Sequence, residues 1–508
     1  MFKNQPPGLI PAALSNMGER FGYYIMNAVL VLFLCSKFGL PEEQSTLIYS
    51  FFYAGIYVLS LVGGIIADRT QNYKGTIISG LVVMTFGYVV LAVPILATPA
   101  NHTWLLTLTC VALFLIAFGN GLFKGNLQAI VGQLYDNPKY AAQRDSGFQI
   151  FYVFINIGGL IAPFVAPMLR SWWLGVHDLK YNADLPALCH QYLSVTDPMS
   201  DENMNNLYTL ITDNIGSQAA DVQAFCTQYL EVFNTGIHYS FIASVAAMLI
   251  SLFIFIATKK GLPSPARKAK TETVSYTAEE RRAMAKEIKQ RMYALFAVLG
   301  IVIFFWFSFH QNGLTLTFFA KEYTDLNLFG MPITAELFQS LNPFFVVFLT
   351  PVVMAVFARQ RARGKEPSTP KKIAIGMGIA ATGFIIMAVG SFVSDLPLHQ
   401  DIVAAGTSPV KVTPLLLMAT YLVLTIAELY ISPLGISFVS KVAPPKYQGI
   451  MQGGWLGATA IGNQLLFIGA VLYESIPIWM TWTVFVVACC ISMCTMLFML
   501  KWLERVAK

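Results

Sequence analysis

The sequence contains few charged residues for its length. Of 508 residues, 33 are Lys or Arg and 27 are Asp or Glu, which together make 12% of the chain, whereas soluble proteins average about 25%. Hydrophobic residues make up 56%, and a soluble protein would need more charge to cover its surface. The composition argues against a soluble enzyme, a disordered scaffold or a secreted disulfide-rich domain, and it predicts an all-α polytopic membrane protein.

Motifs for metal binding and catalysis are also missing. The seven cysteines include no Cys-x-x-Cys pair and no Cys/His spacing suited to zinc, so we expect no metal site and no cofactor. The chain has no HExxH, no GxSxG, no phosphate-binding loop and no paired intramembrane aspartates, which argues against an enzyme. The N-terminus lacks a cleavable signal-peptide pattern, so we expect insertion to begin with the first membrane span.

Long apolar segments dominate what is present. A helix needs about 20 apolar residues to cross a bilayer. This criterion predicts twelve spans, at residues 10–35, 44–67, 75–97, 103–132, 146–170, 237–257, 291–320, 334–358, 372–394, 412–440, 447–471 and 477–502. An even count places both termini on one side of the membrane.

The distribution of Lys and Arg predicts which side that is. With the N-terminus in the cytoplasm, 26 of the 33 lie in cytoplasmic segments and five in outer segments. Since cytoplasmic loops carry the excess of Lys and Arg, we expect both termini to be cytoplasmic. The net charge of +6 then reflects topology, and we expect no nucleic acid partner.

Two hydrophilic connections organise the chain. Residues 258–290 form a basic linker with an amphipathic helix expected around 277–292, and residues 171–236 form an acidic outer insertion with one or two short helices. We expect an N-terminal six-helix bundle at 1–257 and a C-terminal six-helix bundle at 291–508. This arrangement resembles major facilitator transporters, whose substrate sites lie between the two halves.

Five ionisable residues fall deep inside the predicted spans, away from their ends. They are Glu19, Arg20, Lys124, His310 and Glu428. A charge at the bilayer centre costs at least ~2.5–3.5 kcal/mol and by default marks function. A cavity between the halves would be positive on its N-terminal wall and negative on its C-terminal wall, which fits a ligand with a carboxylate at one end and an ammonium at the other. The alternative is a fixed ion-pair lock between helices.

Polar side chains accompany these charges. Tyr24 and Tyr57 are candidates to hold a ligand's backbone or carboxylate through their hydroxyls. Asn156 and Asn342 are amides within spans, and each is costly to bury without a partner. Glu19 lies beside a cation in the sequence, so it is also a candidate proton switch.

Several strings are similar to motifs of the proton-coupled oligopeptide transporter family. They are NMGERFGYY in the first span, GNGLFKGNLQAIVGQLY in the fourth, FYVFINIGG in the fifth, FQSLNPFF in the eighth, AELYISPLGISFVSKVAP in the tenth and GIMQGGWLGATAIGN in the eleventh. The similarity runs across nearly the whole chain except the insertion 171–236. The chain departs from the family at Asn16, where the motif has its first Glu, and at His310, near which the family often has an acid.

The resemblance implies a proton-driven importer of di- and tripeptides that works by alternating access. Arg20 and Lys124 would meet the peptide carboxylate, and Glu428 and Asn342 would hold its ammonium. Tyr24, Tyr57 and Asn156 would contact the peptide backbone or ends, and Trp306 and Trp455 would line side-chain pockets. Glu19 would carry the proton, with His310 as the next candidate.

Other readings stay open. One is a weakly coupled or uncoupled transporter of another small zwitterion or anion; a non-transporting membrane receptor would be expected to add a soluble signalling domain. We expect a monomer in the lipid bilayer of a plasma membrane or bacterial inner membrane.

Cys189 and Cys226 are the two cysteines of the outer insertion, and the compartment outside the cytoplasm permits a disulfide between them. Two free thiols are the alternative.

Overall fold

Twelve long apolar helices make up the protein. The computed structural model describes residues 4–507 except 195–198, 218, 220, 264–277, 329, 333–334, 336 and 406–407. Within this range, twelve helical segments are long and apolar enough to cross a membrane, as the sequence predicts. Large apolar side chains on their outer faces, such as Phe253 at 73% and Phe498 at 92% exposed, suit contact with lipid chains rather than water.

The first six spans form one bundle. They are α1 (Leu9–Phe38), α2 (Glu42–Thr70), α3 (Tyr73–Ala92), α4 (His102–Leu134), α6 (Arg144–Val176) and α9 (Val222–Thr258). The short helices α5 (Pro138–Ala141), α7 (Leu185–Leu193) and α8 (Asp201–Ile215) lie between them, and the turn η1 (Lys259–Gly261) follows α9.

The other six spans form the second bundle. They are α11 (Ala278–Phe309) with α12 (Thr315–Tyr323), α13 (Leu337–Ala362), α14 (Thr369–Val393), α16 (Pro414–Val442), α17 (Gln448–Gln464) with α18 (Leu466–Ser475), and α19 (Ile478–Val506). Smaller elements are the turns η2 (His310–Gly313) and η3 (Pro445–Tyr447), helix α15 (His399–Ala405) and a two-stranded antiparallel hairpin of β1 (Asn327–Leu328) and β2 (Met331–Pro332).

Several predicted boundaries are wrong. The sixth span begins at Val222 instead of 237, so a segment expected to be a separate helix of the insertion is the first part of α9. The amphipathic helix expected around 277–292 is continuous with the seventh span in α11. Neither junction contains a proline, and helical hydrogen bonding continues beyond the apolar stretch that a hydropathy criterion detects. Part of the predicted linker, 264–277, lies outside the described residues.

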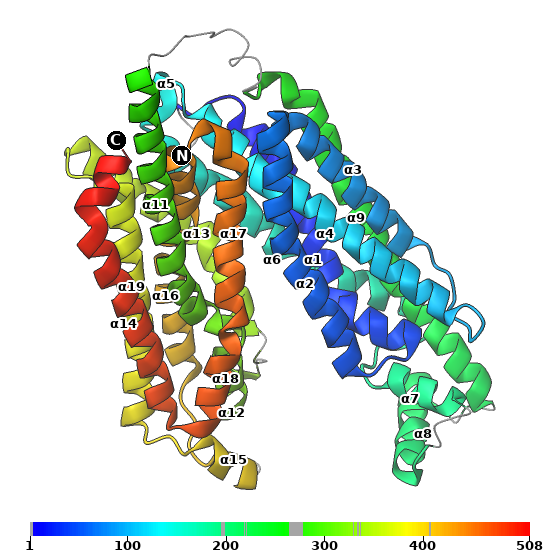
Figure 1. The fold of residues 1–508 in the computed structure, drawn as a ribbon. Helices are drawn as coiled ribbons and strands as arrows, with labels where there is room; N and C mark the ends of the chain where they lie inside the picture. The colour runs from blue at the N-terminus through cyan, green and yellow to red at the C-terminus, as the bar shows by residue number, and fades with distance from the viewer. Residues whose placement is uncertain are drawn as a thin grey trace.

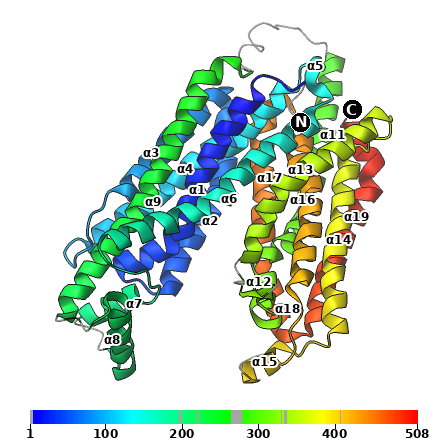
Figure 2. The ribbon, with the colours of Figure 1, turned by 180° about the vertical axis from the view of Figure 1, so that it is seen from behind.

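The two bundles converge at one end and diverge at the other. Figures 1 and 2 show both chain termini at the convergent end, with α7, α8 and α15 at the divergent end. Backbones meet directly between α2 and α17, where a Cβ on Gly64 would stand 2.6 Å from the carbonyl carbon of Gly449. Only a residue without a side chain permits this approach.

Polar contacts join the two bundles at the convergent end. The Asp68 carboxylate of α2 accepts hydrogen bonds from the backbone amides of Gly449 and Ile450, both at 2.8 Å. These amides belong to the first turn of α17, where unpaired N–H groups and the helix dipole attract an anion. On the other side, Asp145 of α6 pairs with Lys372 of α14 at 2.9 Å. The structure is therefore closed at the end that carries the termini.

Candidate functional site

A cavity of about 360 Å³ lies between the two bundles. It is in the size range of small-molecule sites, about 300–1,000 Å³. Ten of the eleven predicted substrate and proton residues line it: Arg20, Tyr24, Tyr57, Lys124, Asn156, Trp306, His310, Asn342, Glu428 and Trp455. They come from eight helices of both halves and from the turn η2, so the folding of the chain brings them together.

The eleventh residue, Glu19, does not line the cavity. It is 0% exposed, and Arg20 donates to its two carboxylate oxygens from Nε and an Nη atom, each at 2.6 Å. Asn120 of α4 also donates to Glu19 at 2.7 Å. Glu19 is thus held behind Arg20, and the pair together adds no net charge to the cavity wall.

Lys124 supplies the surplus positive charge of the N-terminal wall. Within the described part of the chain it forms no ion pair. Its Nζ atom lies 5.9 Å from the ring centroid of Tyr57, and the guanidinium of Arg20 lies 6.0 Å from the ring centroid of Tyr24. Both rings therefore flank cations, and both line the cavity.

Glu428 supplies the negative charge of the opposite wall. It is 5% exposed, and Nδ2 of Asn342 donates to its Oε2 atom at 2.6 Å. Tyr152 of the N-terminal half donates its hydroxyl hydrogen to the other oxygen. Both partners are neutral, so neither offsets the negative charge of the ionised carboxylate. The walls have the opposite polarities that the sequence predicts.

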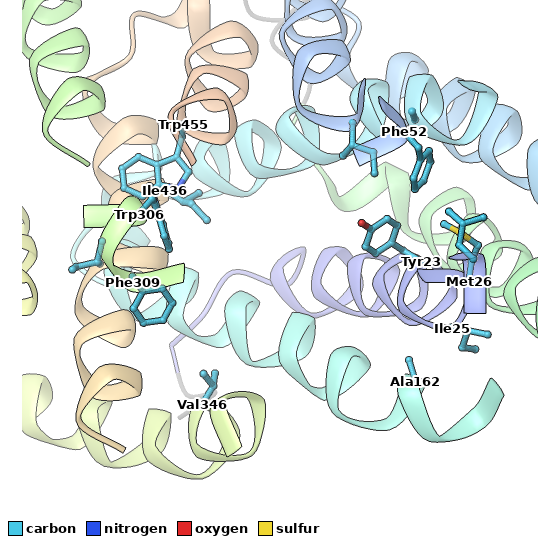
Figure 3. Packing of buried hydrophobic residues seen from close by; sticks show 14 of the residues in the cluster. Tyr23, Ile25, Met26, Phe52, Ala162, Trp306, Phe309, Val346, Ile436 and Trp455 are labelled. Carbon is cyan, nitrogen blue, oxygen red and sulfur yellow. The ribbon is translucent and has the colours of Figure 1, made fainter. Parts of the chain in front are cut away.

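Aromatic side chains close one side of the cavity. Trp306 stacks on His310, with ring centroids 4.8 Å apart and planes 13° apart. Trp455 meets Trp306 edge-on at 6.3 Å. Figure 3 shows Trp306, Phe309 and Trp455 gathered on this side. The indole nitrogen of Trp306 and Nδ1 of His310 are buried and have no hydrogen-bond partner among the described residues, so this apolar surface carries two unpaired polar atoms.

The sequence-based list misses several lining residues. Tyr152 and Gln128 line the cavity, and each lies four positions from a residue on the list, Asn156 and Lys124 respectively. Residues four apart share one helix face, so helical spacing offered a signal for both. Asn312 also lines the cavity, from the turn η2 that interrupts the seventh span. The Asn312–Gly313 pair offered a signal for this interruption, since Asn-Gly is a common turn dipeptide.

The predicted Cys189–Cys226 disulfide is not formed in the structure. Both residues are free cysteines with buried side chains. Packing of α7 against α9 nevertheless brings the thiols together, and a side-chain hydrogen bond with Cys226, together with burial, raises the pKa of the Cys189 thiol.

Fold and site together define the class of protein. Twelve membrane helices in two halves, closed at one end around a central cavity with charged walls, are the construction of a secondary transporter. The POT family sequence model matches residues 74–276 and 264–479, which is most of the chain. The chain therefore belongs to the POT family; it is a multi-pass membrane transporter and not an enzyme.

Named relatives agree with this family. The chain is 27% identical over 485 residues to the peptide transporter YePEPT of Yersinia enterocolitica, with 91% of this chain and 87% of the relative covered. It is 25% identical over 528 residues to dipeptide and tripeptide permease B of Xenorhabdus bovienii, with 99% and 97% covered.

Solved structures share the fold. A crystal structure of a POT peptide transporter in complex with sulfate aligns with a TM-score of 0.57 at 22% identity, covering 100% of this chain and 96% of that one. A POT family transporter in complex with 5-aminolevulinic acid aligns with a TM-score of 0.58 at 20% identity, covering 100% and 98%.

Proposed function

We propose that this protein imports di- and tripeptides together with protons by alternating access. The observation that carries the proposal is the polarity of the central cavity, with Lys124 and Arg20 on one wall and Glu428 on the other. A short peptide is a zwitterion whose carboxylate and ammonium match these walls. The names of the relatives, peptide transporter and dipeptide and tripeptide permease, support the same substrate class.

Each end of the peptide has an assigned set of partners. Lys124 and Arg20 bind the carboxylate, with Tyr24, Tyr57 and Asn156 against the backbone or ends. Glu428 and Asn342 bind the ammonium. Trp306 and Trp455 form the apolar surface for a side chain, since aromatic rings bury large areas at low entropic cost.

The charge distribution supports an outward-facing state of the transporter. The convergent end carries the termini (Figure 1), and the excess of Lys and Arg assigns that end to the cytoplasm. The contacts of Asp68 and Asp145 then close the cytoplasmic side, and peptide would enter from the outer side. The protein acts in the bilayer of a plasma membrane or bacterial inner membrane, and we propose a monomer because one chain encloses the whole cavity.

Glu19 is the proposed proton site. Its carboxylate is bound by Arg20, whose guanidinium also faces the cavity. A peptide carboxylate that draws Arg20 towards the cavity would leave Glu19 with a buried, unpaired charge, which favours protonation. Binding of peptide and uptake of a proton are coupled by competition for one guanidinium. His310, within the cavity wall, is the next candidate.

A second candidate function is weakly coupled or uncoupled transport of another small zwitterion or anion. The observation that favours it is the placement of Glu19 behind Arg20, away from the cavity, in a chain with Asn16 one turn earlier. The complex of a related transporter with 5-aminolevulinic acid supports small zwitterions as a substrate class.

Uptake into liposomes tests both functions. Purified protein is reconstituted and given a labelled dipeptide, with and without an inward proton gradient. The proposed function predicts saturable uptake that the gradient drives above equilibrium. Saturable uptake that ignores the gradient would instead support the second function, and no uptake of any short peptide would refute the first.

A further inference from the structure

A second cavity lies in the N-terminal bundle, away from the central site. Its volume is about 550 Å³, larger than that of the central cavity. It is formed at the divergent end by the last residues of α1, the connection between α3 and α4, and parts of α7 and α9. None of its lining residues lines the central cavity.

A buried lysine provides its charge. Lys37, in the last turn of α1, lines the cavity although the residue is only 7% exposed. Its Nζ atom lies 3.1 Å from Nε2 of His238. No carboxylate of the described residues lies within ion-pair distance of Lys37. A buried cation without an anion is costly, so this arrangement calls for a negatively charged partner.

The histidine beside Lys37 does not supply that partner. Nδ1 of His238 lies 2.7 Å from the carbonyl oxygen of Leu91. A carbonyl only accepts, so Nδ1 carries the hydrogen and the neutral ring offers Nε2 as an acceptor to the ammonium. His238 thus accepts one N–H of Lys37 and brings no negative charge. The rings of Phe33 and Phe38, with centroids 5.1 and 5.9 Å from Nζ, attract the cation but are neutral as well, so no anion balances the ammonium.

Two more imidazoles line the same cavity. Nε2 of His190 lies 2.6 Å from the carbonyl oxygen of Ser36, and Nε2 of His102 lies 3.0 Å from that of Phe38. Both rings therefore donate to the end of α1 and hold Lys37 in place from either side. Glu231 is the one acid among the residues that line the cavity; its side chain is exposed, where water and salt screen its charge.

We propose that this second cavity binds an oxyanion, a carboxylate or a phosphate, whose oxygens accept hydrogen bonds from Lys37. The ligand is either a soluble anion or the headgroup phosphate of a phospholipid, since both present the same oxygens. The site is separate from the peptide cavity, so its occupancy does not depend on the proposed function.

Thermal stability of the purified full-length protein tests the site. Delipidated protein in detergent is titrated with sodium phosphate or sodium acetate at constant ionic strength, and the rise in Tm yields a Kd. The titration is repeated with K37M, with K321M as the matched control at an exposed lysine of the C-terminal half, and with K124M, which removes the unpaired cation of the central cavity. Native mass spectrometry of protein purified with its lipids counts retained phospholipid in each variant.

The soluble source predicts that phosphate or acetate still stabilises K124M, in which the central cavity has lost its unpaired cation. Adding K37M to K124M should then raise Kd at least about tenfold, as expected for loss of a charge-assisted bond, whereas adding K321M to K124M should leave Kd unchanged. If the ligand is a phospholipid headgroup, phosphate and acetate should not stabilise the protein. Native mass spectrometry should then find a phospholipid retained by the wild type and absent from K37M.

Two results would overturn the proposal. One is stabilisation that K124M abolishes and K37M keeps, because the anion would then occupy the central cavity. The other is a K37M protein that matches the wild type in both anion titration and lipid retention. If K37M fails to fold, T227W replaces it. Thr227 lines the cavity from an exposed position, so a tryptophan there fills the space while Lys37 stays in place. T227W should then lose anion stabilisation or retained phospholipid as K37M would, and a T227W protein that matches the wild type in both would overturn the proposal.

Discussion

Replacing Glu428 by Gln tests how the central cavity recognises a peptide's amino end. The change keeps the size of the side chain and its capacity to accept from Tyr152, but it removes the negative charge. A hydrogen bond to a charged group contributes about 1.5–3 kcal/mol, and Glu428 is 5% exposed, so solvent screens it little. We expect KM for a free dipeptide to rise roughly 10- to 150-fold.

The assay compares free and N-acetylated dipeptides as competitors of labelled uptake. Wild-type protein should prefer the free peptide by roughly 10- to 150-fold, because acetylation removes the ammonium that Glu428 binds. In E428Q this preference should fall to within about threefold, since both peptides then lack the charged contact. E474Q, at an exposed acid of α18, is the matched control and should retain the wild-type preference.

Two results would refute this reasoning. Equal competition by free and acetylated dipeptides in the wild type would show that no ammonium contact exists. An unchanged preference in E428Q would place that contact elsewhere in the cavity. Melting curves of both variants separate a loss of recognition from a loss of fold.

The remaining predictions concern coupling, closure and the outer insertion. Glu19→Gln should abolish gradient-driven uptake yet preserve peptide exchange across liposomes; continued accumulation under a gradient would place the proton elsewhere. Asp145→Asn removes the negative charge that pairs with Lys372 and so weakens this contact; spin labels on the convergent ends of α2 and α17 should then report longer distances than in the wild type, and an unchanged distribution would contradict the closure. Cys189 and Cys226 should be recovered as separate, alkylatable peptides from a non-reduced digest, because both are free in the structure; one bridged peptide would contradict this expectation.

The twelve-helix fold was predictable because membrane insertion imposes a local rule. Each span must contain about 20 apolar residues, and this property is read from one segment at a time. The same rule made the candidate site predictable, because charged residues such as Lys124 and Glu428 stand out within apolar segments and are costly to bury there without a function. The family motifs added Trp306 and Trp455, which composition does not distinguish from packing residues.

Contacts between distant segments were decided only by the tertiary structure. The Tyr152–Glu428 hydrogen bond joins residues 276 apart and the Lys37–His238 contact residues 201 apart. Each depends on the rotation and tilt of two helices. Packing among many neighbours sets these angles, and no single segment encodes them.

The sequence by itself determined which residues lie in the membrane and which of them carry charge, since the free energy of transfer from water depends on residue type and segment length. The tertiary structure decided that Glu19 lies behind Arg20 rather than in the cavity, that α9 begins at Val222, and that the bundles close at the end carrying the termini. Those features follow from the fit of side chains between helices, which is a property of the whole folded chain.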